Sequence, residues 1–400
     1  MQHEPGIPWL RKARQLALWV LIRGLLVVCG LLMATGVLEV ALRVHNPFET
    51  RIIGDKIVLP ANRTYEYKND LSEKLDGKIT HAKNSLGFRG DEPPDDFNPA
   101  LTVVTVGGST TESIYLSDGK TWSDALSLRL TDSFRDTWLN NAGLDGHSTY
   151  GHLVLMTDHI KSLQPDIAIF LVGFNDRSRK DPATADLESL KSGISLGSAK
   201  AFVKSLSPYS DVVSLALNTY RTLQARSKGL NHTSVDLQNL EIVPLEQTGW
   251  QETEILHRER FLPGFERRLA ELVQVSRSNG IEPVFVTQPA LFGNGIDGSS
   301  GVDLRTVSVS GVSGQRAWDV LELYNQVTRK VGERNQALVI DLASKLEKNA
   351  RYYYDYIHFT NDGSTVVGEL IWEELCPFLA VTFLSRLAVP ESRILKFHAI

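Results

Sequence analysis

The chain has 400 residues, 42% of them hydrophobic, which suits one large domain with appended segments. Its formal net charge is −5 and it has no basic stripe, so we do not expect it to bind nucleic acid. Its two cysteines, Cys29 and Cys376, are far apart in the sequence, which argues against a disulfide framework. No Cys/His spacing indicates a zinc site.

The amino terminus carries the clearest compositional signal. A basic segment, residues 9–14, precedes a largely apolar stretch over residues 15–44. Residues 16–38 are long enough to cross a bilayer core of roughly 30 Å. A cleaved signal peptide ending near Ala34-Thr35-Gly36 is the alternative, but the apolar stretch is long for that and continues past this site. We therefore interpret residues 1–44 as a cytoplasmic tail and an uncleaved transmembrane anchor.

The charges around this stretch predict its orientation. Basic residues are slightly more numerous on its amino side (Arg11, Lys12, Arg14 and Arg23) than beyond it (Arg43, Arg51 and Lys56). The positive-inside rule then places the amino terminus in the cytoplasm and the rest of the chain outside it, in the periplasm of a bacterium. A second apolar stretch, residues 375–385, is short and contains Pro377, so we expect a helix packed on the domain.

Residues 45–100 are polar and rich in turn-forming residues, which predicts a connector between the anchor and the following domain. Within it, residues 84–90 (Asn-Ser-Leu-Gly-Phe-Arg-Gly) are more patterned than a bare linker. We expect this short segment to dock against the domain formed by residues 101–400.

Residues 101–106 are apolar or β-favouring without alternation, which predicts a strand buried on both faces. Gly107 and Gly108 allow a sharp turn and a close approach to a ligand because neither has a Cβ atom. Ser109 then lies at the carboxyl end of a strand, where open α/β sheets bind their ligands. Ser109 is a candidate nucleophile, and the alternative is that Ser109 or Thr110 only caps a helix.

Strand and helix patterns alternate along the rest of the chain. Strands are predicted at residues 137–140, 166–172, 282–287 and 337–342, and helices at 121–135, 150–163, 261–278, 317–334 and 362–379. This alternation implies a parallel sheet with right-handed crossovers. Insertions at about residues 177–251 and 290–314 interrupt it, and such long segments are usually functional or disordered.

Polar residues follow the predicted strands on one rim of the sheet. Ser109, Gly143 and Asn175 each follow one of the first three strands, and Asp355 and His358 precede the last helix. A serine nucleophile needs a base, and that base needs an orienting carboxylate, which His358 and Asp355 supply. The backbone N–H groups of Ser109 and Gly143, with the Asn175 amide, are the expected donors to an oxyanion. Taken singly, each of these residues also suits a turn or a helix cap.

These motifs resemble those of the SGNH hydrolases, also called GDSL-type esterases and lipases. The matching residues are Ser109 in Gly-Gly-Ser-Thr, Gly143 in Asn-Ala-Gly, Asn175 in Gly-Phe-Asn-Asp, and Asp355 and His358 in Asp-x-x-His. The resemblance covers residues 101 to about 379 and implies a flavodoxin-like three-layer α/β/α sandwich with a five-stranded parallel sheet. It also implies an acyl-enzyme mechanism that uses neither a metal nor a cofactor. One departure is Gly108, where the name-giving motif has Asp, and this removes no catalytic group.

We therefore expect a membrane-anchored serine esterase that acts on O-acyl esters, acetyl or short acyl groups, of an envelope carbohydrate. Its partners are then an acyl ester substrate and, through residues 16–38, the membrane. Two alternatives stay open: an O-acyltransferase to a glycan with the same triad, and a non-catalytic carbohydrate-binding or scaffold protein of the envelope. The complete set of catalytic groups favours an enzyme, while the sequence does not indicate the oligomeric state.

Overall fold

The protein is described by a computed structural model that covers residues 8–45, 52–53, 56–98, 100–179, 206, 209–227, 232–237, 239–240, 242–246 and 248–388. The chain divides into two compact units, of which the larger comprises residues 59–193 and 224–400 and the smaller residues 1–58 and 194–223.

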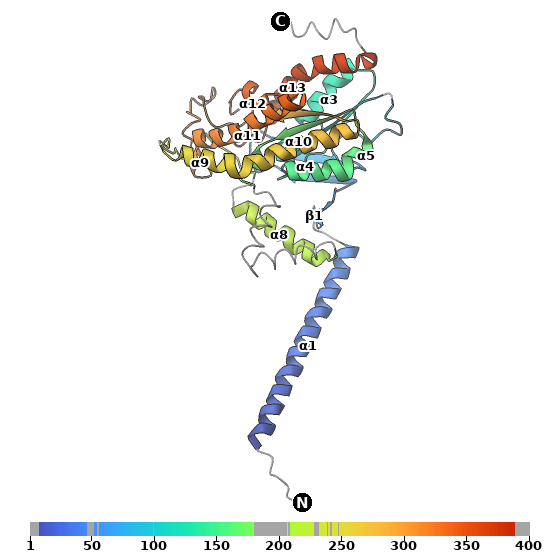
Figure 1. The fold of residues 1–400 in the computed structure, drawn as a ribbon, viewed down its shortest axis with the longest axis vertical. Coiled ribbons are helices and arrows are strands. Elements are labelled where there is room, and N and C mark those ends of the chain that lie inside the picture. Colours follow the sequence, from blue (N-terminus) through green and yellow to red (C-terminus); the bar gives the residue numbers. More distant parts are fainter. Residues whose placement is uncertain are drawn as a thin grey trace, which may run out of the picture. The chain divides into compact units, whose positions relative to one another are not determined.

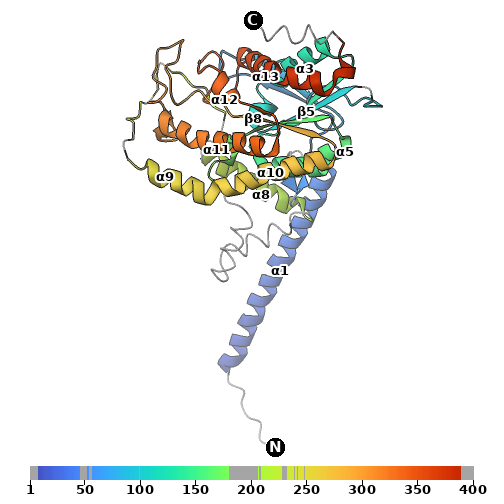
Figure 2. The same ribbon diagram turned by 45° about the horizontal axis from the view of Figure 1, so that its top comes forward.

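A five-stranded parallel sheet forms the centre of the larger unit (Figures 1 and 2). Its strands lie in the order β11 (Val339–Ile340), β8 (Glu282–Thr287), β7 (Ile167–Val172), β5 (Leu101–Gly107) and β6 (Thr137–Asn141). The first strand of the sheet in the sequence, β5, thus lies inside it, and the chain extends the sheet on both sides of it. This is the flavodoxin-like order, and ligands of such sheets bind where the order reverses, beyond the carboxyl end of the first strand. The expected α/β fold is confirmed.

Helices cover both faces of the sheet, which explains why β5 and β7 are buried along their whole length. One layer pairs α3 with α13, and the other contains α4, α10 and α11 (Figure 2). The helices are α2 (Ser109–Glu112), α3 (Trp122–Ser133), α4 (Thr149–Leu155), α5 (Lys161–Leu163), α9 (Trp250–Leu256), α10 (Leu262–Ser278), α11 (Gly314–Asn335), α12 (Leu342–Lys345) and α13 (Asn361–Thr382), with a final turn, η4 (Leu384–Arg386).

The pairing of α3 with α13 follows from local sequence. Thr121 begins α3 through a capping box, in which its side chain and that of Asp124 each accept the other's backbone N–H. Gly368 lets the two helices approach closely, because a Cβ atom there would lie 2.6 Å from the Cβ of Ala125. The apolar end of α13 contains Pro377 and is partly buried in the core, as expected of a packing helix.

Two predicted helices are longer or less regular than the sequence indicates. The helix expected from residue 261 begins at Trp250, as α9 and the π-turn η3 (His257–Phe261) lead directly into α10. The added turns are mostly polar and exposed, so they lack the apolar period that marks a buried helix. The helix expected at 150–163 contains a π-turn, η1 (Met156–Ile160), between α4 and α5.

The two predicted insertions differ in what the structure shows. Residues 180–205 lie outside the described residues, and later in the same insertion the chain forms α8 (Asp211–Ser227). Residues 290–314 are packed, because Phe292, Leu304 and Val307 enter the main core. A short antiparallel pair, β9 (Ser308–Val309) and β10 (Val312–Ser313), ends this segment.

The polar connector is structured over most of its length. After the short pair β1 (Ile52–Ile53) and β2 (Lys56–Ile57), strands β3 (Arg63–Lys68) and β4 (Lys78–Lys83) form an antiparallel hairpin. The segment of residues 84–90 docks as expected, with Phe88 and Arg89 buried. The backbone of Arg89 exchanges two hydrogen bonds with that of Asn141 at the end of β6.

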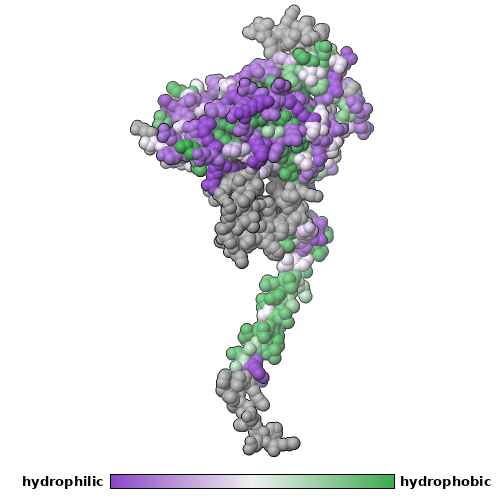
Figure 3. All heavy atoms as spheres, in the orientation of Figure 1, coloured by the Kyte–Doolittle hydropathy of each residue, from purple (hydrophilic) through white to green (hydrophobic). Residues whose placement is uncertain are grey.

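The smaller unit is built on α1 (Pro8–Val44). Residues 12–44 of this helix are long and apolar enough to cross a membrane, and a signal sequence near an amino terminus can have the same length and composition. Figure 3 shows its apolar surface as a continuous green band. Glu39, near its end, accepts hydrogen bonds from Ser210 Oγ and from the backbone N–H groups of Asp211 and Val212 at the start of α8. Arg43 donates to the carbonyl of Tyr209.

Candidate active site

The turn from β5 into α2 places Ser109 at the carboxyl rim of the sheet. A Cβ atom on Gly107 would lie 2.1 Å from Thr111 Oγ1, and one on Gly108 would lie 2.3 Å from Asn175 Nδ2. The turn therefore needs both glycines. Gly108 occupies the N-cap position of α2, so Ser109 and Thr110 are not its cap. Ser109 is the first residue of the helix, and its N–H has no acceptor within it.

Ser109, His358 and Asp355 form a continuous chain of hydrogen bonds. His358 Nε2 lies 2.7 Å from Ser109 Oγ, and His358 Nδ1 lies 2.6 Å from Asp355 Oδ2. All three residues are buried. The second carboxylate oxygen, Asp355 Oδ1, accepts the N–H groups of Ile357 and His358, both at 2.8 Å.

The charge state of Asp355 follows from these contacts. Burial alone would raise its pKa, but the imidazole of His358 and the two backbone N–H groups outweigh burial and lower the pKa below its usual value. The carboxylate is therefore ionised at neutral pH and accepts the Nδ1–H of His358. Nε2 then carries the lone pair that accepts the Ser109 hydroxyl proton.

The side chain of Asn175 lies beside the turn that carries Ser109, where its Nδ2 would be 2.3 Å from a Cβ atom on Gly108. Asn175 lies in a 3-10 turn, η2 (Phe174–Asp176), directly after β7. Its side-chain nitrogen donates one hydrogen to the carbonyl of His147 at 2.9 Å. An amide carries two such hydrogens, so the other can be donated to an oxyanion.

Gly143 differs from the prediction. Its N–H, expected as an oxyanion donor, instead donates to Asn141 Oδ1 at 2.9 Å. A backbone amide has one hydrogen, so in this conformation Gly143 is not aimed at an oxyanion. The position still requires glycine, because a Cβ atom there would lie 2.4 Å from the backbone nitrogen of Glu112. Close packing against α2 therefore explains Gly143.

A buried ion pair fixes the turn that carries Asn175. Asp176 lies 3.1 Å from the guanidinium of Arg268 on α10, and both side chains are buried. Asp176 also accepts the N–H and the hydroxyl of Thr149 at the start of α4. The sequence patterns singled out neither Asp176 nor Arg268 as a site residue. These contacts restrain the turn that carries Asn175.

The hairpin and docking segment hold the end of α2 on the other side. Arg89 donates to the carbonyls of Glu112, Ser113 and Leu116 at 2.8–2.9 Å. Lys83 and Glu112 form a buried ion pair at 3.2 Å. Glu112 is buried and also accepts the N–H of Asp145.

A sequence comparison identifies the family. Residues 105–366 match the model of the GDSL-like Lipase/Acylhydrolase family. The chain belongs to this family. The match covers more than half of the chain and includes Ser109, Asn175, Asp355 and His358. The protein is therefore an enzyme of the GDSL type, and the family match supports esterase activity.

Solved structures of this type are similar at low identity. An acetyl xylan esterase is 16% identical over 68% of this chain and 98% of its own, with a TM-score of 0.38. An acetylxylan esterase from Geobacillus stearothermophilus is 12% identical over 69% and 94%, with a TM-score of 0.39. TesA is 14% identical over 69% and 98%, with a TM-score of 0.37. No curated protein matches the chain.

A second histidine lies at the triad of this GDSL-type chain. The ring of His232 lies 4.1 Å from that of His358, centroid to centroid, and its Nδ1 lies 2.7 Å from the hydroxyl of Tyr354. His232 comes from the long insertion, whose sequence has no motif around it. Donor atoms of His232, Asp355 and His358 lie within 4.8 Å of one another, but Asp355 and His358 already bond to each other.

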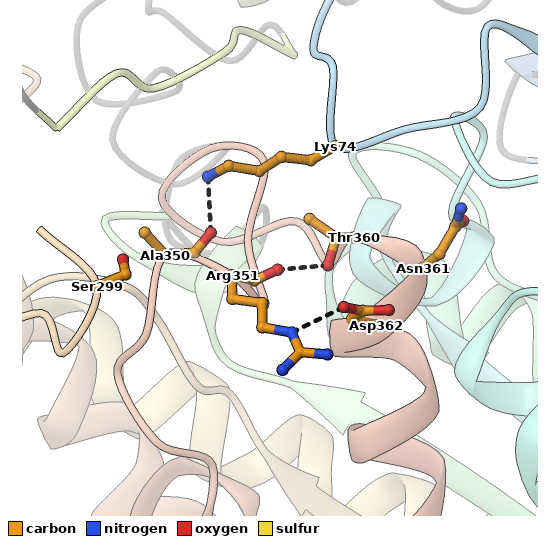
Figure 4. Close-up of a pocket in the computed structure, with 7 residues that line it drawn as sticks. All are labelled: Lys74, Ser299, Ala350, Arg351, Thr360, Asn361 and Asp362. Carbon is orange, nitrogen blue, oxygen red and sulfur yellow. Dashed lines mark hydrogen bonds and ion pairs between the residues drawn. The ribbon is translucent and has the colours of Figure 1, made fainter.

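A cavity of about 430 Å³ lies beside the start of α13 (Figure 4). Its charged groups are already paired: Lys74 donates to the carbonyls of Ala350 and Tyr353, and Arg351 bonds Asp362 at 2.8 Å. The triad does not line this cavity.

Breaking the Lys83–Glu112 pair from one side should destabilise the protein, because it leaves a buried charge without its partner. Lys83→Met should lower the free energy of unfolding by about 3–5 kcal/mol, measured by denaturation of the detergent-solubilised chain. The double variant Lys83→Met/Glu112→Gln should recover much of the loss. Lys78→Met, which breaks an exposed pair with Glu66, should cost about 1 kcal/mol or less. Equal losses in the two single variants would contradict this account.

Proposed function

We propose that the protein is a serine esterase that removes O-acyl groups through a covalent acyl-enzyme intermediate on Ser109. The observation that most strongly supports this proposal is the chain of short hydrogen bonds from Asp355 through His358 to Ser109. It provides a nucleophile, a base and an orienting carboxylate in one buried line.

The reaction follows from these positions. Ser109 Oγ attacks the ester carbonyl carbon while His358 Nε2 takes its proton. The Ser109 N–H and the Asn175 amide donate to the oxyanion that forms, and their fixed orientation stabilises it. The intermediate collapses, the C–O bond to the alcohol breaks, and His358 returns the proton to the leaving oxygen. A water molecule, deprotonated by His358, then releases the acyl group as a carboxylic acid.

We also propose that α1 is a retained anchor with the larger unit outside the cytoplasm. The length of the apolar helix supports retention, because α1 runs without a break from Pro8 to Val44, past the candidate cleavage site. Envelope carbohydrate esters with acetyl or short acyl groups are then the proposed substrates. If a sugar hydroxyl replaces water in the second half-reaction, the same residues make the enzyme an acyltransferase, which product analysis decides.

Removing triad members should give graded losses of turnover. Ser109→Ala should abolish both turnover and labelling by a fluorophosphonate, and His358→Ala should lower kcat by roughly 10⁴–10⁶-fold. Asp355→Ala should cost less, because an unoriented imidazole still accepts protons part of the time. Ser127→Ala and His159→Ala are matched controls and should react like wild type. Full activity in Ser109→Ala would disprove the serine mechanism.

Asn175→Ala should lower kcat by roughly 100- to 1,000-fold, the usual loss for one oxyanion donor. KM should change little, since the lost hydrogen bond strengthens mainly in the transition state. Steady-state kinetics on a soluble acyl ester measure both constants, with Asn335→Ala as the matched control. A raised KM with an unchanged kcat would instead make Asn175 a substrate-binding residue.

Membrane orientation can be tested with reporters fused after Ile400. A reporter that works only outside the cytoplasm should be active, because the basic residues in the amino-terminal part of α1 favour a cytoplasmic amino terminus. The fusion should also remain in the membrane fraction after a carbonate wash. Activity of a cytoplasm-only reporter would reverse the orientation, and a shortened soluble product would show that α1 is cleaved.

A further inference from the structure

Aromatic rings form a strip that ends on the catalytic base. Tyr67 of the β3–β4 hairpin lies 6.3 Å from Tyr115, and Tyr115 lies 4.9 Å from His232, between ring centroids. His232 in turn lies 4.1 Å from His358. All of these residues belong to the larger unit, although they come from four separate segments of the chain. The strip, defined as Tyr67, Tyr115 and His232, leads from the hairpin to the triad.

The strip becomes more buried toward the triad. Tyr67 is 36% exposed, Tyr115 is half-buried, and the His232 side chain is 10% exposed. Burial, together with the nearby carboxylates of Asp70 and Asp145, raises the pKa of Tyr115, so its ring stays a neutral phenol at any ordinary pH. The strip therefore runs from an exposed ring on the hairpin to a buried ring beside His358.

A carboxylate lies at the edge of the strip. Asp145 follows β6 in the same loop as Gly143, and its side chain is 37% exposed. Its Oδ2 lies 3.7 Å from His232 Nε2, which is beyond direct hydrogen-bond distance. Tyr354 engages the other ring nitrogen of His232 and so fixes the ring. A hydroxyl lying beside the pair can donate to Asp145 and bond His232 Nε2 at the same time.

We propose that the strip and Asp145 form the subsite for a carbohydrate leaving group. A sugar ring has C–H faces and hydroxyl edges, which match aromatic faces flanked by a carboxylate and an imidazole. An aliphatic alcohol offers neither the C–H face of a sugar ring to the aromatic rings nor further hydroxyl groups to Asp145 and His232. The inference rests on the proposed function, because the strip matters for catalysis only if His358 is the base.

The test compares two acetate esters that differ only in their alcohol, an O-acetylated disaccharide and ethyl acetate, with the full chain in detergent. Tyr115→Ala, Asp145→Asn and His232→Gln should each lower kcat/KM for the disaccharide ester about tenfold, the effect of one lost hydrogen bond or ring contact. For ethyl acetate, Tyr115→Ala and Asp145→Asn should stay within about twofold of wild type. Tyr67→Ala should affect the disaccharide ester but not an acetylated monosaccharide, because Tyr67 is the ring furthest from His358.

Asp132→Asn and His159→Gln are matched controls outside the strip and should leave both rates unchanged. Equal losses of kcat/KM on both esters, or no loss on the disaccharide ester, would overturn the proposed subsite. Neither result would contradict the proposed esterase activity. Faster hydrolysis of a long-chain aliphatic ester than of the disaccharide ester would assign the strip to lipid instead and overturn it too. Fluorophosphonate labelling of Ser109 keeps the two questions apart, because an unlabelled wild-type serine overturns the proposed function itself.

Discussion

The hydrogen bond between His358 and Ser109 joins segments 249 residues apart, and much of the larger unit serves to keep it. Ser109 is fixed by a strand buried on both faces and by two glycines that permit the turn. His358 lies two residues before Thr360, the N-cap of α13, and α13 packs closely on α3 through Gly368. Because packed interiors transmit small shifts, loosening either helix would change the distance on which proton transfer depends.

Buried charges reinforce the same rim. Asp176 and Arg268 hold the turn of Asn175, and Lys83 and Glu112 hold the end of α2. Compared with apolar residues of similar size, such buried ion pairs add little net stability. Removing one partner is nevertheless costly, because it leaves the other charge buried and unpaired. Their position behind the candidate oxyanion donor and the nucleophile indicates that they maintain geometry. The hairpin before the sheet is therefore a support of the active site, although its composition resembles a linker.

The sequence predicted the sheet well, because continuous apolar strands such as β5 and β7 carry a strong local signal. It also placed Ser109, Asp355 and His358 on one rim, since motifs that follow parallel strands converge there. It did not predict the roles of Lys83, Arg268 or His232, because their partners are distant in the sequence and no local pattern reports such contacts. The partner of the Gly143 N–H was missed for another reason: hydrogen-bond direction depends on the local turn, which composition does not determine.

The central claim is that Ser109 becomes acylated during turnover. Rapid acid quenching of the enzyme with an O-acetylated substrate, followed by peptide mass spectrometry, tests it directly. The account predicts one added acetyl group on the wild-type peptide that contains Ser109. The acetylated fraction should be larger at low temperature, where deacylation is slow. Turnover with no acylated peptide at any quench time, or an acetyl group carried on another residue instead, would contradict it.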